Sequence, residues 1–426
     1  MQNHFNRFFI FQERFKSFPT DFLNLIKSEV DERFYFYGDH FRRHSDEKIL
    51  NFLKGILVFI LSLSKKKRNN VILSTAYYEV DNLLLKRNWN VSRPWWRYNI
   101  KAHNIYSFNL YRLSKLIHHK LKNDNLNQLF SFEFQELINS YKTQIIAFLK
   151  EKEVKAVILS NDQYFNEKIL IEAAKLAGIP TFVFAHGFLF YSTPSDFLLA
   201  DYLVVWGKIS KDNFLSNGVR PDKIIVSGNP KRYMHVDRNQ EFKFSFENVV
   251  VLTNSLNGIL PNHPYEDTLS DRSNCIAYLE EIRFALEQFG VKNAYLKTHP
   301  SENPKWYKKM MGCKYYKIID GPIEDILLDA SLVIGPSSTV LFDSLCFGVN
   351  YIVYNPRDFR NNGYAGYPLN SFFAGKDARV PVAASTEDLI EILKSKNSIK
   401  TEILDELGID DLNLESLELI IKKYCE

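Results

Sequence analysis

The chain has 426 residues, of which 46% are hydrophobic and 24% are charged, proportions typical of a globular protein and not of a disordered or collagen-like one. Its 54 Lys and Arg side chains nearly balance its 50 Asp and Glu side chains, which leaves a formal charge of +4. Bulk charge therefore gives no reason to expect nucleic-acid binding. A chain of this length is expected to form two or three domains.

The first 150 residues carry few recognisable signals. Their longest apolar run, Gly55–Leu63, is too short for a membrane span, which takes about 20 residues. Four basic residues, Lys65–Arg68, follow it. Such a run can rest on an anionic membrane face, but the sequence favours a buried helix ending in a solvated basic turn. With no signal peptide and four cysteines in no CxxC pair, we expect a cytoplasmic protein, peripheral membrane contact being the open alternative.

From about residue 150, short apolar runs alternate with helical patterns. Runs rich in Val and Ile that end at turn-forming residues are typical of strands buried on both faces of a parallel sheet. Helices are expected at Asn166–Ala177, Tyr278–Phe289 and Thr339–Phe347, each followed by glycine. The strands are expected at Ala156–Leu159, Thr181–Ala185, Tyr202–Trp206, Lys223–Val226, Val249–Thr253, Ala294–Lys297, Leu332–Ile334 and Tyr351–Tyr354.

The polar segment Asp237–Glu247 interrupts this alternation, and we place a domain boundary there. We expect residues 1–240 to form an N-terminal α/β domain with a helical extension, residues 248–400 a second α/β domain, and residues 401–426 a closing amphipathic helix. Alternating strands and helices predict parallel α/β layers. Two such Rossmann-like domains would face each other across a cleft, where the carboxyl ends of the strands bind ligands.

Polar side chains follow two expected strands of the second domain. Strand Ala294–Lys297 runs into Thr298-His299-Pro300, and strand Leu332–Ile334 runs into Gly335–Thr339, where a helix starts. Free N–H groups in the first turn of a helix attract phosphate, and the imidazole and hydroxyl groups can donate further hydrogen bonds. The residues expected to bind a nucleotide and its phosphates are Lys297, His299, Gly335, Ser337, Ser338, Thr339 and Asp343, the last as an acceptor for ribose hydroxyls.

Each of these features has a plainer explanation when taken alone. Ser337–Thr339 is typical of a helix cap, and His299 of a surface histidine before a turn. Their occurrence after two strands of one expected sheet favours phosphate binding. Three further side chains, Asn254, Ser255 and Asn257, lie in a loop that can reach the donor or be an ordinary polar turn. Lys231 and Arg232 can pair with a phosphate or sugar carboxylate, or form a solvated face.

The pairs His299-Pro300 and Ser337-Ser338 resemble motifs of bacterial GT-B glycosyltransferases. The closest sets use CMP-activated sugars, namely sialyltransferases and the Kdo transferases of capsule and lipopolysaccharide assembly. In the first domain, the order Phe184–Gly187, Ala200–Gly207 and Val226–Pro230 is similar to that of surface-polysaccharide transferases, including polyol-phosphate polymerases. The resemblance covers about residues 155–355.

The resemblance implies a role for individual residues. It places His299 against the donor phosphate, where it helps the nucleotide leave, with Ser337 and Ser338 on the same phosphate. Asp162 falls near the carboxylate that inverting members use as general base, although an Asx turn or helix cap explains it equally well. His186, after the next strand, is the second catalytic candidate.

One position departs from the pattern of the family. Many relatives carry an acid soon after the glycine and proline of the segment that corresponds to Gly228–Arg232, but here Tyr233 follows. Some retaining Kdo transferases are thought to use a carboxylate nucleophile in this part of the cleft. The sequence therefore leaves inversion and retention both open.

The resemblance implies a transferase that moves Kdo or another ulosonic acid from a CMP-sugar to a bacterial surface polysaccharide, O-antigen or lipopolysaccharide acceptor. Its expected partners are the nucleotide sugar and a glycan or lipid-linked glycan, with no nucleic acid. We expect no metal ion and no cofactor besides the donor. The alternatives are a CDP-polyol phosphotransferase and a non-catalytic GT-B-like protein that binds a nucleotide sugar.

Overall fold

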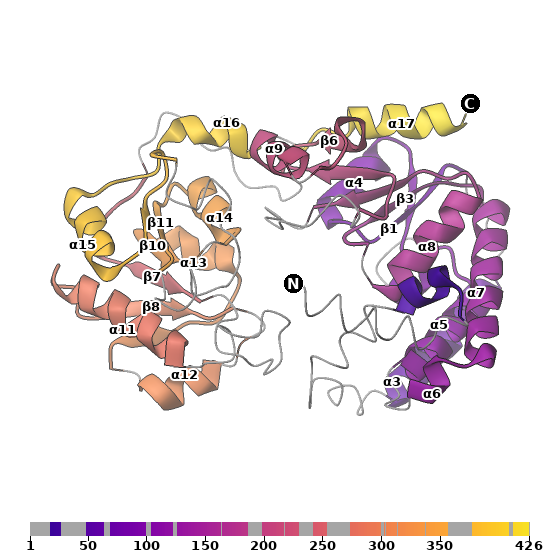
Figure 1. The fold of residues 1–426 in the computed structure, drawn as a ribbon, viewed down its shortest axis with the longest axis horizontal. Coiled ribbons are helices and arrows are strands. Elements are labelled where there is room, and N and C mark those ends of the chain that lie inside the picture. The colour runs from indigo at the N-terminus through magenta and orange to yellow at the C-terminus, as the bar shows by residue number, and fades with distance from the viewer. Residues whose placement is uncertain are drawn as a thin grey trace.

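The chain forms two α/β units, each built on a parallel sheet of six strands (Figure 1). All strand pairs in both sheets are parallel. This confirms the expected α/β class with two Rossmann-like domains, the architecture of the GT-B fold. This computed structural model describes residues 18–26, 48–63, 69–98, 104–121, 126–162, 164–185, 198–216, 218–229, 242–253, 273–299, 302, 304–312, 314–336, 338–356, 377–408 and 412–425.

The first sheet has the strand order β2-β1-β3-β4-β5-β6. In this doubly wound order, the chain starts at β1, adds β2 on one side and continues with β3 on the other, so that β1 and β3 form the topological switch point. The strands are β1 Val71–Ser74, β2 Asn90–Ser92, β3 Val154–Leu159, β4 Thr181–Phe184, β5 Tyr202–Val205 and β6 Ile224–Val226.

The second sheet has the order β9-β8-β7-β10-β11-β12. Counted from its first strand this is 3-2-1-4-5-6, the order of a Rossmann fold, with the switch point between β7 and β10. Ligands of open α/β sheets bind outside the carboxyl ends of the strands at that point. The strands are β7 Val249–Leu252, β8 Ala294–Lys297, β9 Tyr316–Ile318, β10 Leu332–Gly335, β11 Tyr351–Tyr354 and β12 Val382–Ala383.

Helices cover both faces of each sheet (Figure 1). The helices that precede β7 are α3 Lys48–Ser62, α4 Tyr78–Lys86, α5 Phe108–Leu121, α6 Leu126–Leu129, α7 Phe132–Glu151, α8 Phe165–Leu176 and α9 Lys208–Ser216. Those that follow are α11 Ser273–Glu287, α12 Pro304–Met311, α13 Ile323–Asp329, α14 Val340–Cys346, α15 Thr386–Ser395, α16 Leu404–Leu407 and α17 Glu415–Cys425.

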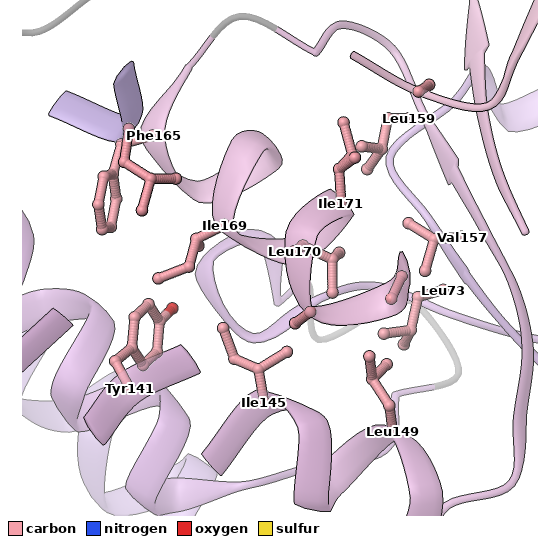
Figure 2. Packing of buried hydrophobic residues seen from close by; sticks show 14 of the residues in the cluster. Leu73, Tyr141, Ile145, Leu149, Val157, Leu159, Phe165, Ile169, Leu170 and Ile171 are labelled. Atoms are coloured by element: carbon pink, nitrogen blue, oxygen red, sulfur yellow. The ribbon is translucent and has the colours of Figure 1, made fainter. Parts of the chain in front are cut away.

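Strand β3 shows why the first sheet needs helices on both sides. Successive side chains of a strand point to opposite faces. Val157 and Leu159 therefore pack in the core under α7 and α8, as Figure 2 shows, while Ala156 and Ile158 pack in the core on the other face. All four side chains are fully buried. Burial of a large aliphatic side chain contributes about 1.5–3 kcal/mol, so both cores stabilise the sheet.

The C-terminal helix α17 belongs to the core of the first unit, although it follows the second in sequence. Leu414, Leu417 and Ile421 pack against the β1 and β3 side chains Ile72 and Ile158. In Figure 1, α17 accordingly lies over the first sheet while α15 lies beside the second. The two units are thus connected a second time, by the end of the chain as well as by the link before β7.

The eight strands expected from the sequence all occur, with ends that differ by at most two residues. The glycines expected to end three helices, Gly178, Gly290 and Gly348, have φ values of +73°, +76° and +68°, which L-residues with side chains rarely adopt. The segment expected as one closing helix is interrupted instead. It contains the 3-10 turn Thr401–Ile403, α16 and α17, because Gly408 with φ +72° ends α16.

Helix α3 differs from the expectation of a buried helix. Only one side of it is covered, and several large apolar side chains on the other side are exposed, among them Leu53, Ile60 and Leu63. The sequence could not show this, because an apolar run has the same composition whether its partner is protein or absent. In the part of the chain that the structure describes, no helix is long and apolar enough to cross a membrane.

Two glycines allow the end of the chain to reach the first unit. A Cβ atom on Gly408 would lie 2.7 Å from the Gly207 Cα and still closer to the carbonyl of Trp206. A Cβ atom on Gly207 would likewise overlap the backbone of Leu407 and Gly408. Real Cβ atoms do not approach backbone this closely, so the contact between α16 and the loop after β5 requires glycine on both sides.

We predict that Gly408→Ala lowers the free energy of unfolding by about 1–3 kcal/mol more than Gly290→Ala. Both glycines have φ above +70°, but a Cβ on Gly290 would meet nothing within 4 Å, so the control carries only the cost of the left-handed conformation. Urea unfolding followed by circular dichroism measures the difference. Equal losses in the two variants would contradict the close approach.

Candidate functional site

Three strands of the second sheet end side by side around its switch point. Strand β7 lies between β8 and β10. Thr253 follows β7, His299 follows β8, and Pro336 follows β10. Because the three strands are parallel, these residues lie at one edge of the sheet. The structure therefore brings together the two strand ends that the sequence selected.

A buried carboxylate joins two of these strand ends. Glu302 is 7% exposed, and its Oε2 accepts hydrogen bonds from the Thr253 hydroxyl and, at 3.1 Å, from the His299 backbone N–H. Its Oε1 accepts from the Tyr307 hydroxyl of α12 at 3.0 Å. The Glu302 N–H donates to the His299 carbonyl at 2.9 Å. Glu302 thus fixes the backbone of His299 relative to β7 and α12.

The His299 imidazole is partly buried, and burial lowers its pKa from the usual 6.5. A lowered pKa keeps the imidazole neutral at pH 7, with one N–H donor and one acceptor nitrogen. An anion bound beside it would have the opposite effect, because negative charge stabilises the imidazolium form. The site can therefore gain a proton when it binds phosphate.

The end of β10 is shaped by Tyr351 of the neighbouring strand β11. Its hydroxyl donates to the Pro336 carbonyl at 2.6 Å. A Cβ on Gly335 would overlap that hydroxyl and approach the Leu252 Cβ to 3.1 Å. The packing of Tyr351 and Leu252 therefore requires glycine at position 335. This role differs from the phosphate contact that the sequence suggested for Gly335.

Ser338 and Thr339 lie in the turn before α14, and both are partly exposed. The Val340 N–H donates to the Ser338 hydroxyl at 3.3 Å, and Thr339 occupies the N-cap position without a side-chain cap bond. Helix α14 begins at Val340, one residue later than expected, and has seven residues. Hydroxyl groups at the end of β10 are thus present, as the sequence predicted.

Two other expected nucleotide contacts lie differently. Lys297 directs its Nζ away from β10, donating to the Gly321 carbonyl beyond β9 at 2.8 Å. Asp343 is 2% exposed in the first turn of α14. A ribose contact by Asp343 stays a prediction and would require this carboxylate to become accessible.

The first sheet also presents polar groups at its switch point. Thr75 follows β1, and its Oγ1 accepts from the Ser160 N–H, which follows β3, at 3.0 Å. Asp162, two residues later, is 7% exposed. Its Oδ2 accepts from the Leu199 N–H at 2.7 Å and the Ala200 N–H at 3.4 Å. These bonds give Asp162 a structural role in holding the segment before β5, and its role as a base stays a prediction.

The carboxyl edges of the two sheets meet at Trp206. This residue follows β5, and its ring lies 6.4 Å from the ring of Tyr77, which follows β1. The ring of Phe342 in α14 lies 5.4 Å from the Trp206 ring. Trp206 therefore links the first sheet to α14 of the second unit.

Sequence reasoning missed an ion pair at the same edge. The Ser74 hydroxyl donates to Asp81 at 2.5 Å, and Arg93 pairs with the same carboxylate. The Arg93 guanidinium also donates to the Ser74 and Ala76 carbonyls at 3.1 and 3.0 Å. Burial raises the pKa of Asp81 to about 6 despite the attraction of Arg93. The cluster holds the turn from β1 to α4, and no sequence spacing links its members.

The remaining expected site residues lie outside the described residues: His186, Lys231, Arg232, Asn254, Ser255, Asn257 and Ser337. Glu302 was missed as well, although its spacing of three residues after His299 is a usable signal for a turn-bridging acid. In the described ranges no group of three or more His, Cys, Asp or Glu side chains is arranged to hold a metal ion.

No protein-family model matches the chain, and no curated protein matches it significantly. Similar solved structures include the UDP-GlcNAc 2-epimerase of Methanocaldococcus jannaschii, with a TM-score of 0.49 and 16% identity over 83% of this chain and 99% of that one. MurG of Acinetobacter baumannii has a TM-score of 0.47 and 12% identity over 84% and 99%. The lipopolysaccharide outer core galactosyltransferase WaaB has a TM-score of 0.46 and 11% identity over 84% and 99%. Likeness at this level carries no argument about activity. The assignment of the fold is based on the strand orders of the two sheets.

We predict that Glu302→Ala lowers the free energy of unfolding by about 2–4 kcal/mol, because it leaves three buried donors without their acceptor. The exposed Glu391 of α15 provides the control: Glu391→Ala should cost less than about 0.5 kcal/mol. Urea unfolding measures both. A loss in Glu302→Ala as small as that in the control would contradict the bridging role of the carboxylate.

Proposed function

We propose that the protein transfers a sugar from a nucleotide donor, whose phosphate binds at the carboxyl ends of β8 and β10. The observation that carries this proposal is the placement of His299 and Ser338 on either side of β7 at the switch point of a Rossmann-type sheet. Nucleotides bind at such points because the edge of the sheet presents free N–H groups and the strand order opens a crevice.

The dimensions of the sheet suit a phosphate group. Strands β8 and β10 are two inter-strand spacings apart, roughly 10 Å. A phosphate accepts hydrogen bonds of about 2.8 Å on each side, so one group above the end of β7 is large enough to reach donors from both neighbouring strands. His299 would supply an N–H, and Ser338 a hydroxyl.

In the proposed reaction, the bond between the anomeric carbon of the sugar and the phosphate oxygen breaks, and an acceptor hydroxyl forms the new glycosidic bond. The nucleotide leaves with the bonding electrons, so negative charge grows on its phosphate. Hydrogen bonds from His299, Ser337 and Ser338 would stabilise that charge. A base would take the proton of the acceptor, and Asp162 and His186 are the candidates.

We propose CMP as the nucleotide and Kdo or another ulosonic acid as the sugar, with a growing surface polysaccharide or lipopolysaccharide as acceptor. This rests on the resemblance of the motifs at His299 and Ser337–Ser338. A CDP-polyol phosphotransferase is the second candidate, favoured by the first-domain motif order. UDP ligands are the competitors against which the choice of CMP is tested.

The proposal requires no metal ion, because neutral donors on the chain would stabilise the leaving phosphate. It also places the protein in the cytoplasm, where nucleotide sugars are made available, with peripheral contact to the membrane if the acceptor is lipid-linked. We therefore expect the sugar-transfer activity to persist in an excess of metal chelator.

We predict that CMP raises the thermal unfolding midpoint of the protein more than CDP or UDP at equal concentration. A ligand at 100 times its Kd stabilises by about 2.7 kcal/mol, which a thermal shift assay detects. His299→Ala and Ser338→Ala should each abolish most of the CMP effect. His119→Ala is the matched control, because His119 is exposed on α5, and it should retain the full effect.

Each outcome bears on a different part of the proposal. A larger shift with UDP would overturn the choice of donor, and no shift with any nucleotide would overturn the nucleotide site. Asp162→Asn keeps a side-chain oxygen for the Leu199 N–H and removes the base. If this variant binds CMP but releases none from a CMP-sugar while the wild-type protein does, the protein is an enzyme; if the wild-type protein releases none either, it is a binding protein.

A further inference from the structure

The first unit contains a cavity that has no part in the candidate nucleotide site. Its volume is about 730 Å³, within the range of about 300–1,000 Å³ that is typical of small-molecule sites. Four segments contribute to it, namely the turns that lead into β1 and β2, strand β3 and helix α17. The lining residues are Asn70, Arg87, Asn88, Trp89, Lys155, Glu418 and Lys422.

The cavity lies at the amino edge of the first sheet. Asn70 directly precedes β1, Trp89 directly precedes β2, and Lys155 is the second residue of β3. Because these three strands are parallel, Thr75 and Ser160 lie at the opposite, carboxyl edge. The six residues of β3 span roughly 20 Å. One small ligand therefore cannot occupy both edges of the sheet.

A buried carboxylate fixes one wall of the cavity. Glu418 of α17 is 8% exposed. One of its oxygens accepts a hydrogen bond from Arg87 Nη1 at 2.7 Å, and the other accepts from the Trp89 Nε1–H at 3.2 Å. The indole N–H is thus satisfied within the protein, which leaves the carbon surface of the ring for a ligand. Side chains that are held in place before a ligand binds lower the entropic cost of binding.

Positive charge predominates among the lining side chains. Arg87, Lys155 and Lys422 are basic, and Glu418 is the acid among them. Glu418 pairs with Arg87, but within the described residues neither lysine forms an ion pair. The positive charges of the two lysines are therefore not balanced by the protein. A phosphate ester, with a charge of about −1.5 to −2 at pH 7, would balance both.

The two asparagines supply groups that suit hydroxyls. Asn70 and Asn88 line the cavity and are exposed, and among the described residues neither carboxamide has a hydrogen-bond partner. A carboxamide both donates and accepts hydrogen bonds, as a sugar hydroxyl does. The aromatic ring of Trp89 offers an apolar surface against which the C–H groups of a sugar ring can pack. The lining thus combines groups for an anion with groups for a sugar.

We propose that this cavity binds a phosphorylated sugar, with the phosphate paired to Lys155 and Lys422 and the sugar ring packed on Trp89. Asn70 and Asn88 would bind the hydroxyl groups. A sugar carboxylate fits less well, because its single charge balances only one of the two lysines. The inference rests on the amino edge of the first sheet and does not depend on the transfer reaction.

Isothermal titration calorimetry of the full-length protein at low salt measures the affinity for glucose 6-phosphate, glucose and inorganic phosphate. We expect glucose 6-phosphate to bind at least about tenfold more tightly than either of the others, because each of them lacks one group of contacts. Lys155→Gln with Lys422→Gln should weaken that binding at least about tenfold, and salt should weaken it in the wild-type protein. Binding should also change the tryptophan fluorescence, and Trp89→Phe should abolish this change.

Two control proteins show where the probe binds. Lys308→Gln with Lys309→Gln removes two exposed basic residues from α12 of the second unit, and it matches the loss of charge in the lysine variant of the cavity. His299→Ala changes the candidate nucleotide site instead. Both control proteins should bind glucose 6-phosphate as the wild type does.

Three results would overturn the inference. One is the absence of glucose 6-phosphate binding by the wild-type protein. Another is a loss of binding in either control that equals the loss in Lys155→Gln with Lys422→Gln, because the probe would then bind elsewhere or respond to charge in general. The third is equal affinity for inorganic phosphate and glucose 6-phosphate, which would indicate an adventitious ion only. Because these titrations contain no nucleotide, they can succeed or fail independently of the CMP experiment.

Discussion

The arrangement of the candidate site depends on one buried carboxylate. Glu302 accepts hydrogen bonds from the end of β7, from the backbone of His299 and from the Tyr307 hydroxyl of α12. A buried carboxylate is costly unless its oxygens are satisfied, and here three donors satisfy it. The same bonds fix where β8 ends and how His299 leaves the sheet. The backbone of His299 is therefore fixed by bonds that join β7, the end of β8 and α12.

The second constraint is the contact between the two units. The Trp206 ring contacts the rings of both Tyr77 and Phe342. Gly207 and Gly408 allow the backbones of the loop after β5 and of α16 to touch. From there the chain reaches α17, which completes the core of the first sheet. The carboxyl edges of both sheets are thereby held near each other, which a reaction between a donor and an acceptor requires.

The sequence predicted the fold better than the site. Runs of Val and Ile indicated the central strands. By contrast, β2 is short and polar, β12 has only two residues, and β1 lies in a region with no alternation to reveal it. The turn after β10, which we propose binds phosphate, was selected from its serines, and of these Ser338 lies at the end of β10 as expected. The buried carboxylates were harder: Glu302 and Asp81 act through partners such as Thr253 and Arg93, whose proximity only the folded sheet creates. Asp162 is the opposite example: the sequence marks it as a candidate base because it follows a strand, but in the structure its carboxylate accepts hydrogen bonds from backbone N–H groups.

The most direct test of the account is the pKa of the His299 imidazole, measured by NMR of carbon-13-labelled histidine in the absence and presence of saturating CMP, with His299→Gln to assign the signal. The account predicts a value below 6.5 in the free protein, because burial disfavours the imidazolium form. It predicts a rise of about one unit or more when CMP binds, because the phosphate stabilises that form. A His299 titration that is unchanged while CMP is bound would contradict the account.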